Sequence, residues 1–397
     1  MERLIEKSNK AILSTDYPYR RHVIGKINWN WKMNGIIGAR GTGKTTLLLQ
    51  KLKELKQEGH DVLYARLDDF YFSDHRLNDL ADEFRKQGGG FLYLDEIHKY
   101  PGWPEELKNI YDTMPELKVV FSGSSIIDLM ATDADLSRRA LNYEMTGLSF
   151  REFLLMSGIS NSTPFSLDEI LQNHVEIAAG MIRQFPVLKY FRTYLRSGYY
   201  PYFLEPDRDY LLTLEQVIRT VMEVDMRFIE NYDVTQSRKM LLLLKIIASS
   251  APFKPNVLKI SERTGLHRHT VLQYFHYLEK ARMIKLLNHP EKHISRLQKP
   301  DKIFLENPNL FYALNPEMVD IGNLRETFVL NQLSVNHEVN LHARVDFMVD
   351  FKYLLEIGGK NKKSSQIKDL DHAFLFMDDI EIGNKRTIPI WLLGFLY

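Results

Sequence analysis

The chain has 397 residues, of which 44% are hydrophobic, 26% charged and 12% aromatic. This composition excludes a disordered or collagen-like chain, and at roughly 150 residues per domain the length predicts two to four domains. The 52 lysines and arginines against 51 acidic residues give a net charge of +1, which is no sign of a strongly basic nucleic-acid binder. The absence of cysteine excludes disulfides, thiolate zinc sites and cysteine nucleophiles.

The apolar runs do not predict a membrane or targeting segment. The first residues, MERLIEKSNKAILS, place charges where a signal peptide has its apolar core. The longest apolar runs, 240–249 and 388–397, are shorter than the roughly 20 residues that a membrane-spanning helix needs. We therefore expect a cytoplasmic protein that does not contact a membrane.

Between residues 33 and 150, short β-rich runs alternate with helical ones. Strands are predicted at 33–37, 61–67, 91–96 and 118–123. The segments between them carry apolar residues three or four apart, as helices with one buried face do. The alternation predicts an α/β domain with a mostly parallel sheet covered by helices. The apolar helix positions are Leu48, Leu52 and Leu55, then Leu77, Leu80 and Phe84, then Leu107, Ile110 and Tyr111.

A glycine-rich motif joins the first predicted strand to the helix that follows it. It reads GARGTGKT and is a full match to the phosphate-loop pattern G-x-x-x-x-G-K-[ST]. The glycines let backbone N–H groups point at an anion, and the helix adds its positive N-terminal end. Lys44 is expected to reach the β- and γ-phosphates of ATP, and the Thr45 hydroxyl to ligate Mg²⁺. The predicted nucleotide-binding residues are Gly38, Ala39, Arg40, Gly41, Thr42, Gly43, Lys44, Thr45 and Thr46.

Polar residues lie at the ends of the third and fourth predicted strands, 91–96 and 118–123. One strand ends in Asp95 and Glu96, and the other in Ser122, Ser124 and Ser125. Ligands of open α/β sheets bind beyond the carboxyl ends of the strands. We predict that Asp95 holds Mg²⁺, that Glu96 positions or activates the attacking water, and that the Ser122 hydroxyl senses the γ-phosphate. A turn of small residues is the alternative for the serines.

The pattern changes three times after the α/β domain, which we place at 1–155. Residues 156–235 lack strand alternation and predict a helical lid or connector. Residues 236–305 give three helices followed by two short apolar runs, the order of a winged helix-turn-helix. Residues 306–397 give a helix, two strand-like runs and an apolar end, which predict a second α/β unit. Four domains follow.

Charge is unevenly distributed along the chain. Residues 236–302 contain fourteen lysines and arginines against four acids, so this segment carries +10 and the remainder −9. A recognition helix in this segment would present Arg268, His269 and Gln273 to the major groove of DNA, and Lys292 would contact phosphate. The alternative is a protein-binding module whose charge pairs with the acidic remainder of the chain.

Three carboxylates near the end of the chain have the order of a metal-dependent nuclease core. Glu326 falls on a predicted helix, and Asp346 and Glu356 fall on predicted strands. In the restriction-endonuclease-like, or PD-(D/E)XK, fold such carboxylates gather Mg²⁺ and a lysine assists the water. Here the position two residues after Glu356 is Gly358, and the next lysine is Lys360. We therefore predict a vestigial, noncatalytic nuclease-like module.

Six motifs are spread over nearly the whole chain. They read GARGTGKTTLL, FLYLDEIHKYPGW, VVFSGSS, LSRRALNYEMTGLSFREF, YLRSGYYPYF and VDFMVD followed by YLLEIGGK. With them the chain resembles AAA-type P-loop ATPases of bacteria and archaea whose C-terminal half is a domain of unknown function. In this family a Gly-Arg pair usually occupies the place of Arg138 and Arg139. The resemblance therefore implies that Arg139 is the γ-phosphate arginine, in its own subunit or toward a neighbour, and a solvated surface pair is the alternative.

The predicted function is Mg²⁺-dependent ATP hydrolysis by Glu96, Lys44, Arg139 and Ser122, used as a conformational switch for the C-terminal half. The alternative is a nucleic-acid-binding protein or nuclease in which ATP only sets the conformation. A small-molecule kinase is disfavoured because the sequence shows no acceptor site, whereas Asp95 and Glu96 suit water. A protein partner and an oligomer stay open.

Overall fold

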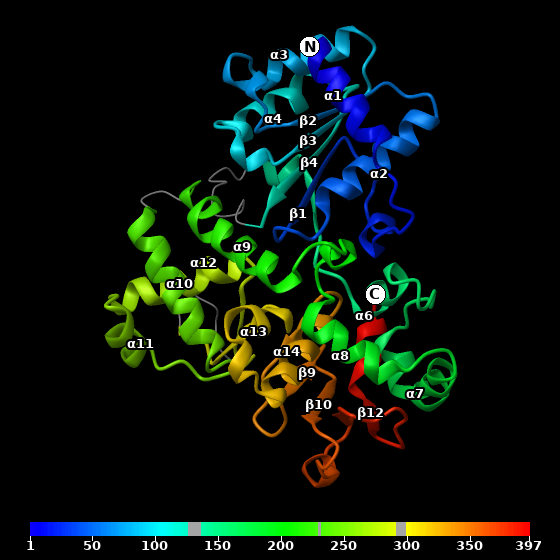
Figure 1. Ribbon diagram of the computed structural model, residues 1–397, viewed down its shortest axis with the longest axis vertical. Helices are drawn as coiled ribbons and strands as arrows, with labels where there is room; N and C mark the ends of the chain where they lie inside the picture. The colour runs from blue at the N-terminus through cyan, green and yellow to red at the C-terminus, as the bar shows by residue number, and fades with distance from the viewer. Residues whose placement is uncertain (126–135, 229–231, 291–298) are drawn as a thin grey trace. The chain divides into compact units, whose positions relative to one another are not determined.

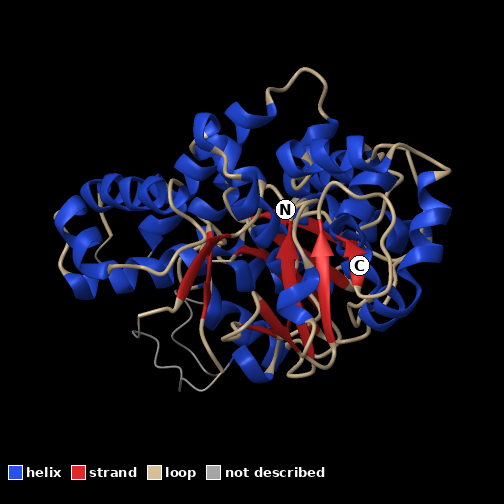
Figure 2. Ribbon diagram, turned by 90° about the horizontal axis from the view of Figure 1, so that it is seen from below, coloured by secondary structure: helices blue, strands red, loops and turns tan. Residues whose placement is uncertain are grey.

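The computed structural model describes residues 1–125, 136–228, 232–290 and 299–397, and these residues form two compact units (Figure 1). The first unit contains the described residues of 1–146 together with Asp225–Phe228, and the second contains 147–224 and the described residues from 232 onward. Helices make up most of the regular structure, and the strands pair with one another in sheets (Figure 2). The boundaries of the four expected domains, at 155, 235 and 305, remain predictions.

The first unit is built on a five-stranded sheet whose neighbouring strands are all parallel. Four strands occur where the sequence predicts them. The fifth was not predicted, because its LNYE sequence is short and largely exposed. All the strands run the same way, so their carboxyl ends meet at one edge of the sheet. In the order β2-β3-β4-β1-β5, the strands are β1 (Met33–Gly38), β2 (Val62–Arg66), β3 (Phe91–Asp95), β4 (Lys118–Ser124) and β5 (Leu141–Glu144).

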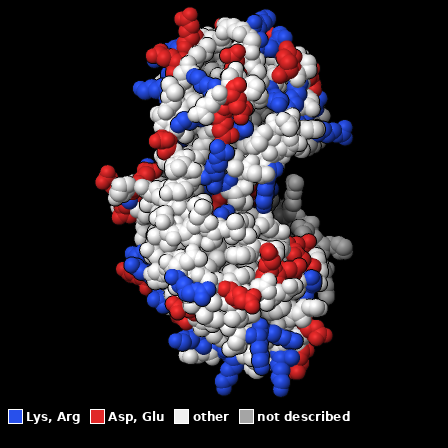
Figure 3. Space-filling view, turned by 90° about the vertical axis from the view of Figure 1, so that its right-hand side faces the viewer, with Lys and Arg blue, Asp and Glu red and all other residues white. Residues whose placement is uncertain are grey.

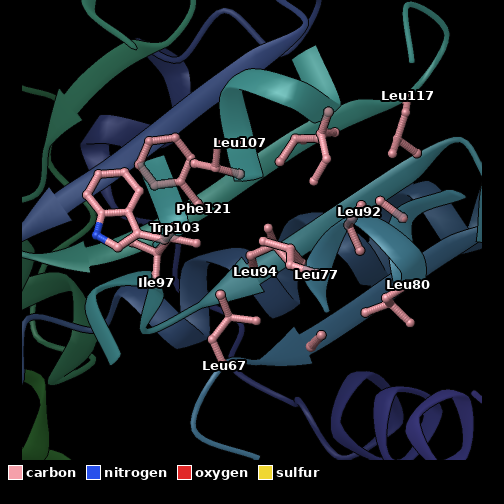
Figure 4. Close-up of a cluster of buried hydrophobic side chains, with 14 of the residues drawn as sticks. Leu67, Leu77, Leu80, Leu92, Leu94, Ile97, Trp103, Leu107, Leu117 and Phe121 are labelled. Atoms are coloured by element: carbon pink, nitrogen blue, oxygen red, sulfur yellow. The ribbon is translucent and has the colours of Figure 1, made fainter. Parts of the chain in front are cut away.

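Helices cover both faces of this sheet. Leu92 and Leu94 of β3 pack with residues of α3 and α4, whereas Tyr93 between them packs with residues of α2 on the other face. Figure 4 shows the first of these two clusters. Burying one leucine stabilises a fold by about 1.5–3 kcal/mol, so the alternation fixes which face of the sheet each of these side chains covers. The helices are α1 (Glu2–Leu13), α2 (Lys44–Gln57), α3 (Leu77–Lys86) and α4 (Trp103–Thr113), with short 3₁₀ helices η1 (His22–Gly25), η2 (Phe70–Ser73), η3 (Ile97–Lys99) and η4 (Leu136–Arg138).

The second unit begins with helices whose starts are marked in the sequence. The hydroxyls of Ser149 and Ser166 each accept a hydrogen bond from the backbone N–H of a glutamate three residues later. The side chain of that glutamate accepts a hydrogen bond from the backbone N–H of the serine. This pair of bonds, a capping box, fixes the start of the helix. The helices are α6 (Phe150–Met156), α7 (Leu167–Ile182), α8 (Val187–Ser197) and α9 (Tyr210–Glu223), with η5 (Pro201–Leu204).

The middle of the second unit has the element order that the sequence predicts. Three helices precede an antiparallel pair of short strands. Gly265, in the left-handed conformation, ends the second of these helices and allows the sharp turn into the third. Its assignment as a winged helix stays a prediction. The elements are α10 (Val234–Ala248), α11 (Val257–Thr264), α12 (Arg268–Lys280), β6 (Ile284–Leu287) and β7 (Lys302–Leu305).

The C-terminal part of the second unit contains a five-stranded mixed sheet. Strands β10, β11 and β12 are parallel, whereas β9 is antiparallel to β10 and to β8. Phe395 packs against Phe150, and Phe328 against Phe191, which joins α6, α8, α14 and the chain end in one aromatic core. The elements are α13 (Asn309–Leu314), η7 (Pro316–Met318), α14 (Ile321–Leu333), β8 (Val339–Asn340), β9 (Phe347–Val349), β10 (Tyr353–Gly358), η8 (Ser364–Ile367), β11 (Ala373–Met377), β12 (Thr387–Pro389) and η9 (Ile390–Phe395).

Helices of the described ranges are all too short or too polar to cross a lipid bilayer.

Candidate functional site

Glycines shape the loop between β1 and α2. Gly41 and Gly43 have φ angles of 85° and 93°, in the left-handed region that residues with a Cβ atom rarely adopt. Gly38 is constrained differently, because a Cβ atom there would lie 2.2 Å from the carbonyl oxygen of Met145. Helix α2 begins directly after the loop, and its first turn carries the two predicted threonines, Thr45 and Thr46. Loop, strand and helix therefore have the arrangement that a phosphate site needs.

Lys44 is buried against the loop itself. Its Nζ donates hydrogen bonds to the carbonyl oxygens of Gly38 and Ala39, each at 2.8 Å. Burial lowers the pKa of Lys44, while the carboxylates of Glu96 and Asp95 oppose this shift. A phosphate would offer the ammonium group a charged acceptor in place of two neutral carbonyls, which favours the exchange.

Asp95 ends β3 and collects three hydroxyl groups. Only 2% of its surface is exposed. Its Oδ2 accepts hydrogen bonds from Thr45 Oγ1 at 2.8 Å and from the Tyr64 hydroxyl at 2.7 Å, and its Oδ1 accepts from the Ser122 hydroxyl. Burial and the Asp95 carboxylate raise the pKa of Tyr64, so its phenol remains a donor. The structure thus brings together the predicted residues Thr45, Asp95 and Ser122, and adds Tyr64, which the sequence pattern did not reveal.

Glu96 follows the end of β3 in a left-handed backbone conformation, with a φ angle of 59°. This conformation is uncommon for residues with a side chain and is concentrated at functional sites. The Glu96 N–H donates to Ser122 Oγ at 3.1 Å, and the carboxylate forms an ion pair with Lys99 Nζ at 3.0 Å. Burial raises the pKa of Glu96, but the basic groups around it, His98 first, outweigh burial and hold that pKa below its ordinary value. Glu96 is therefore ionised near neutral pH.

His98 is a buried neighbour of Glu96 that sequence reasoning missed. Its Nδ1 accepts a hydrogen bond from the backbone N–H of Ser124 at 3.3 Å, so the neutral ring carries its hydrogen on Nε2. That nitrogen lies 3.7 Å from Glu96 Oε2. Burial lowers the pKa of His98 to about 4, which keeps the ring neutral at pH 7. The only signal in the sequence is its position two residues after Glu96.

Two further contacts support the phosphate loop and have no local sequence signal. Arg21 is buried and donates to the carbonyl oxygens of Thr42 and Thr146, each at 2.7 Å. Asp225 forms an ion pair with Arg40 of the loop at 3.0 Å, and 1% of the Asp225 side chain is exposed. Both contacts join residues that are far apart in the sequence, so no motif could have shown them.

Arg139, the candidate γ-phosphate arginine, is held in a pair away from the Asp95 cluster. Its Nε and Nη2 atoms donate to the two carboxylate oxygens of Asp112 in α4, each at 2.9 Å. Arg138 beside it is exposed. The role of Arg139 stays a prediction, and it would require the guanidinium to leave Asp112.

Helix α12 presents part of the predicted DNA-contacting set. Arg268 and His269 are exposed in its first turn. Gln273 is half-buried and donates from Nε2 to the Tyr277 hydroxyl at 2.6 Å, so its amide is already engaged. Lys292 lies outside the described residues. On the face drawn in Figure 3, basic and acidic side chains are intermixed mainly in the upper and lower parts.

The late carboxylates lie within electrostatic reach of one another, and each has an internal partner. Glu326 Oε2 pairs with Lys302 Nζ at 2.5 Å, and Asp346 Oδ2 accepts from the N–H of Ile357 at 2.8 Å. Burial raises the pKa of Glu326, Lys302 opposes the rise, and the charges of Asp346 and Glu356 add to it. The three predicted residues are thus neighbours, although protein donors already satisfy them.

The lysine that pairs with Glu356 is Lys362, and not Lys360, the next lysine in the sequence. A Cβ atom at Gly358 would lie 2.4 Å from the Cβ of Lys362. Gly358 therefore leaves the room that Lys362 occupies beside Glu356. The spacing of residues in the sequence could not show that Lys362 lies beside Glu356.

Oxygen ligands suit Mg²⁺ at the phosphate loop. The Thr45 hydroxyl and the Asp95 carboxylate are 2.8 Å apart, and Mg²⁺ commonly binds through one or two protein oxygens together with water and substrate phosphates. Within the described parts of the chain, no group of three or more histidine, aspartate or glutamate residues is placed to hold a metal by itself. The residues therefore fit an ion that arrives with a nucleotide.

The parallel sheet, the glycine loop and the Asp95 cluster define a P-loop nucleotide-binding domain. Residues 30–154 match the family model of an AAA domain, which supports ATP binding by this part of the chain. Residues 188–344 match the model of a domain of unknown function, DUF8612. No curated protein matches the chain.

Several solved structures are similar to the chain at low identity. AMPPCP-bound DnaA from Aquifex aeolicus is 19% identical over 65% of this chain and 84% of that one, with a TM-score of 0.26. The replication initiator DnaA bound to AMPPCP and single-stranded DNA is 17% identical over 71% and 91%, with a TM-score of 0.30. The S. cerevisiae Hsp104–ADP complex is 15% identical over 70% and 39%, also with a TM-score of 0.30.

Proposed function

We propose that the chain is an ATPase of the AAA type that needs Mg²⁺, and that its nucleotide state switches the conformation of its C-terminal half. The observation that carries the proposal is the buried Asp95, which receives the Thr45 hydroxyl beside an intact phosphate loop. Glu96 stands next to it, ionised and in a strained backbone conformation.

The loop supplies the binding of ATP. Backbone N–H groups from Gly41 to Thr45 and the N-terminal end of α2 attract the β- and γ-phosphates. Lys44 exchanges its two carbonyl acceptors for phosphate oxygens. Thr45 and Asp95 would hold Mg²⁺, which would supply positive charge to oppose that of the phosphates.

Hydrolysis uses water as the acceptor. The water oxygen attacks the γ-phosphorus, the bond from that phosphorus to the β,γ-bridging oxygen breaks, and ADP leaves with the electron pair. Glu96 orients the water and accepts its proton, and Lys99, at 3.0 Å, holds the Glu96 carboxylate before ATP arrives. The product is ADP and inorganic phosphate.

Phosphate release and nucleotide affinity test this assignment together. We expect Lys44→Ala to lose ATP binding. We expect Glu96→Gln to bind ATP like the wild type but to turn over about 100-fold or more slowly, because it cannot take the proton. Glu58→Gln, an exposed glutamate just past the end of α2, is the matched control and keeps both properties. A wild-type rate in Glu96→Gln would refute the role of Glu96.

For the nuclease-like part we propose a noncatalytic role. Lys302 and Lys362 neutralise two of the three carboxylates, and an ammonium group at that place competes with a metal ion. Incubation with supercoiled, linear and single-stranded DNA in Mg²⁺ or Mn²⁺ should give no cleavage. Robust cutting that Glu356→Ala abolishes would overturn this part.

A second candidate function is nucleic-acid binding in which ATP only sets the conformation. The exposed Arg268 and His269 in the first turn of α12, within the +10 segment, favour it. Salt-dependent DNA binding that survives Lys44→Ala but weakens in Arg268→Glu would support this function. Absence of binding at low salt would exclude it.

A further inference from the structure

Asp225 is a buried carboxylate at the phosphate loop that the proposed reaction does not use. It begins the short 3₁₀ helix Asp225–Phe228 (η6). Both of its oxygens accept hydrogen bonds from Arg40 Nη1, at 3.0 and 3.4 Å. The Arg40 side chain is 35% exposed, whereas that of Asp225 is 1% exposed. The loop is thus anchored by a carboxylate that has little access to water.

Asp225 lies in the short segment of the chain that connects helices α9 and α10. Helix η6 packs with the first unit, although α9 before it and α10 after it belong to the second unit. A displacement of Asp225 therefore reaches α9 directly through the backbone, because α9 ends at Glu223. The Arg40–Asp225 pair is a contact between the nucleotide loop and the connection that joins those two helices.

The pair also lies in the field of the residues that handle phosphate. Burial raises the pKa of Asp225, Arg40 opposes this rise, and the charge of Glu96 adds to it. The charge of Asp225 in turn opposes the lowering of the Lys44 pKa by burial. Since Glu96 serves the γ-phosphate end of the site, a γ-phosphate would add negative charge near Asp225 and offer Arg40 a second anion.

We propose that the ion pair between Arg40 and Asp225 breaks when the γ-phosphate of ATP binds, and we call this pair the latch. This proposal rests on the proposed ATP site. The structure shows the pair closed. With ATP the γ-phosphate competes with Asp225 for the Arg40 guanidinium, and η6 leaves its position. Separating a buried ion pair costs free energy, so the latch opposes ATP binding. The same coupling makes the conformation of η6 respond to ATP, since linkage between two sites is reciprocal.

Nucleotide affinities test the latch without reference to turnover. Asp225→Asn keeps the size of the side chain but removes its charge. We expect it to bind a non-hydrolysable ATP analogue about tenfold more tightly than the wild type, with less than about a twofold change for ADP. Glu116→Gln is the matched control. It removes a carboxylate that pairs with Arg85 at 2.9 Å, just before the amino end of β4 and thus at the opposite edge of the sheet, and both affinities should stay unchanged.

Hydrogen exchange of the wild-type chain gives a second measurement that needs no variant. The amides of Asp225–Phe228 should exchange about tenfold faster with the ATP analogue than with ADP or without nucleotide. Equal exchange in the three states would overturn the latch, as would an unchanged preference for ATP over ADP in Asp225→Asn. A wild-type chain that binds no ATP would instead refute the proposed function, so the two failures are distinguishable.

Discussion

Among the described residues, Asp95 in the first unit and the carboxylates around Glu326 and Glu356 in the second differ in the groups that pair with them. In the first unit Asp95 accepts hydrogen bonds from the hydroxyls of Thr45, Tyr64 and Ser122. In the second unit Glu326 and Glu356 pair with lysines. A hydroxyl can remain beside a carboxylate when both bind a cation, whereas an ammonium group repels that cation. The partner of a carboxylate, more than the carboxylate itself, decides which cluster suits Mg²⁺.

The largest expected effect separates the two clusters by activity. Asp95→Asn should lower ATP turnover by about 10²–10³-fold, because the charge that holds Mg²⁺ is lost. Asp346→Asn, the matched change in the second cluster, should leave turnover unchanged. Phosphate release at saturating ATP and Mg²⁺ measures both variants. Equal losses would show that the two clusters work together.

The second prediction concerns the ion pair at the nuclease-like cluster. Lys302→Met should lower the free energy of unfolding by about 3 kcal/mol, because it leaves the half-buried Glu326 beside two other carboxylates. The double variant Lys302→Met with Glu326→Gln should recover most of that loss. Chemical denaturation of the wild type, both single variants and the double variant gives the coupling. A double variant as unstable as Lys302→Met would show that the lysine acts through packing.

The third prediction is a pH dependence that comes from the first cluster. His98 has a pKa of about 4 in the folded chain, below its ordinary value near 6.5, so unfolding takes up a proton between these pH values. Its contribution to stability is complete above about pH 6.5 and falls by roughly 2–3 kcal/mol as the pH drops to about 4. His98→Asn keeps an acceptor for Ser124 N–H and should remove this part of the pH dependence. Unfolding free energies from pH 4 to 7 measure the difference, and parallel curves would contradict it.

The smallest expected effect tests the close approach at the second cluster. Gly358→Ala should lower the free energy of unfolding by about 1–2 kcal/mol, because its Cβ atom would overlap Lys362. Gly180→Ala in α7, where a Cβ atom would meet nothing within 4 Å, should instead stabilise the chain by about 0.5–1 kcal/mol. Thermal or chemical denaturation compares the pair. A neutral Gly358→Ala would mean that Lys362 moves aside at no cost.

The spacing of apolar residues in the sequence was enough to predict the strands and helices that bury one regular face. Strands β1, β2, β3 and β4 fall where the apolar runs predict them, and the helices between them bury the predicted leucines. Strand β5 escaped prediction because its LNYE sequence is mostly exposed at the sheet edge and lacks an apolar run. Its pairing with β1 depends on backbone hydrogen bonds that the residue types do not reveal.

The phosphate loop and its acidic partner were also visible in the sequence, for a physical reason. Their residues occupy consecutive positions, and in a parallel sheet the carboxyl ends of neighbouring strands meet at one edge. A glycine motif after one strand and Asp95 after another are therefore brought together by topology alone. The structure places Thr45 Oγ1 and Asp95 Oδ2 2.8 Å apart, as that reasoning expects.

By itself, then, the sequence determined the α/β class of the first unit, the phosphate loop and the residues that end β3. Only the tertiary structure decided which distant side chains complete each cluster. Asp225 reaches Arg40, Lys302 reaches Glu326, and Lys362 takes the space that Gly358 leaves beside Glu356. The reason is that periodicity and motifs record neighbours along one element. The partner of a buried charge is set by how separate elements pack, and that packing leaves no fixed spacing in the sequence.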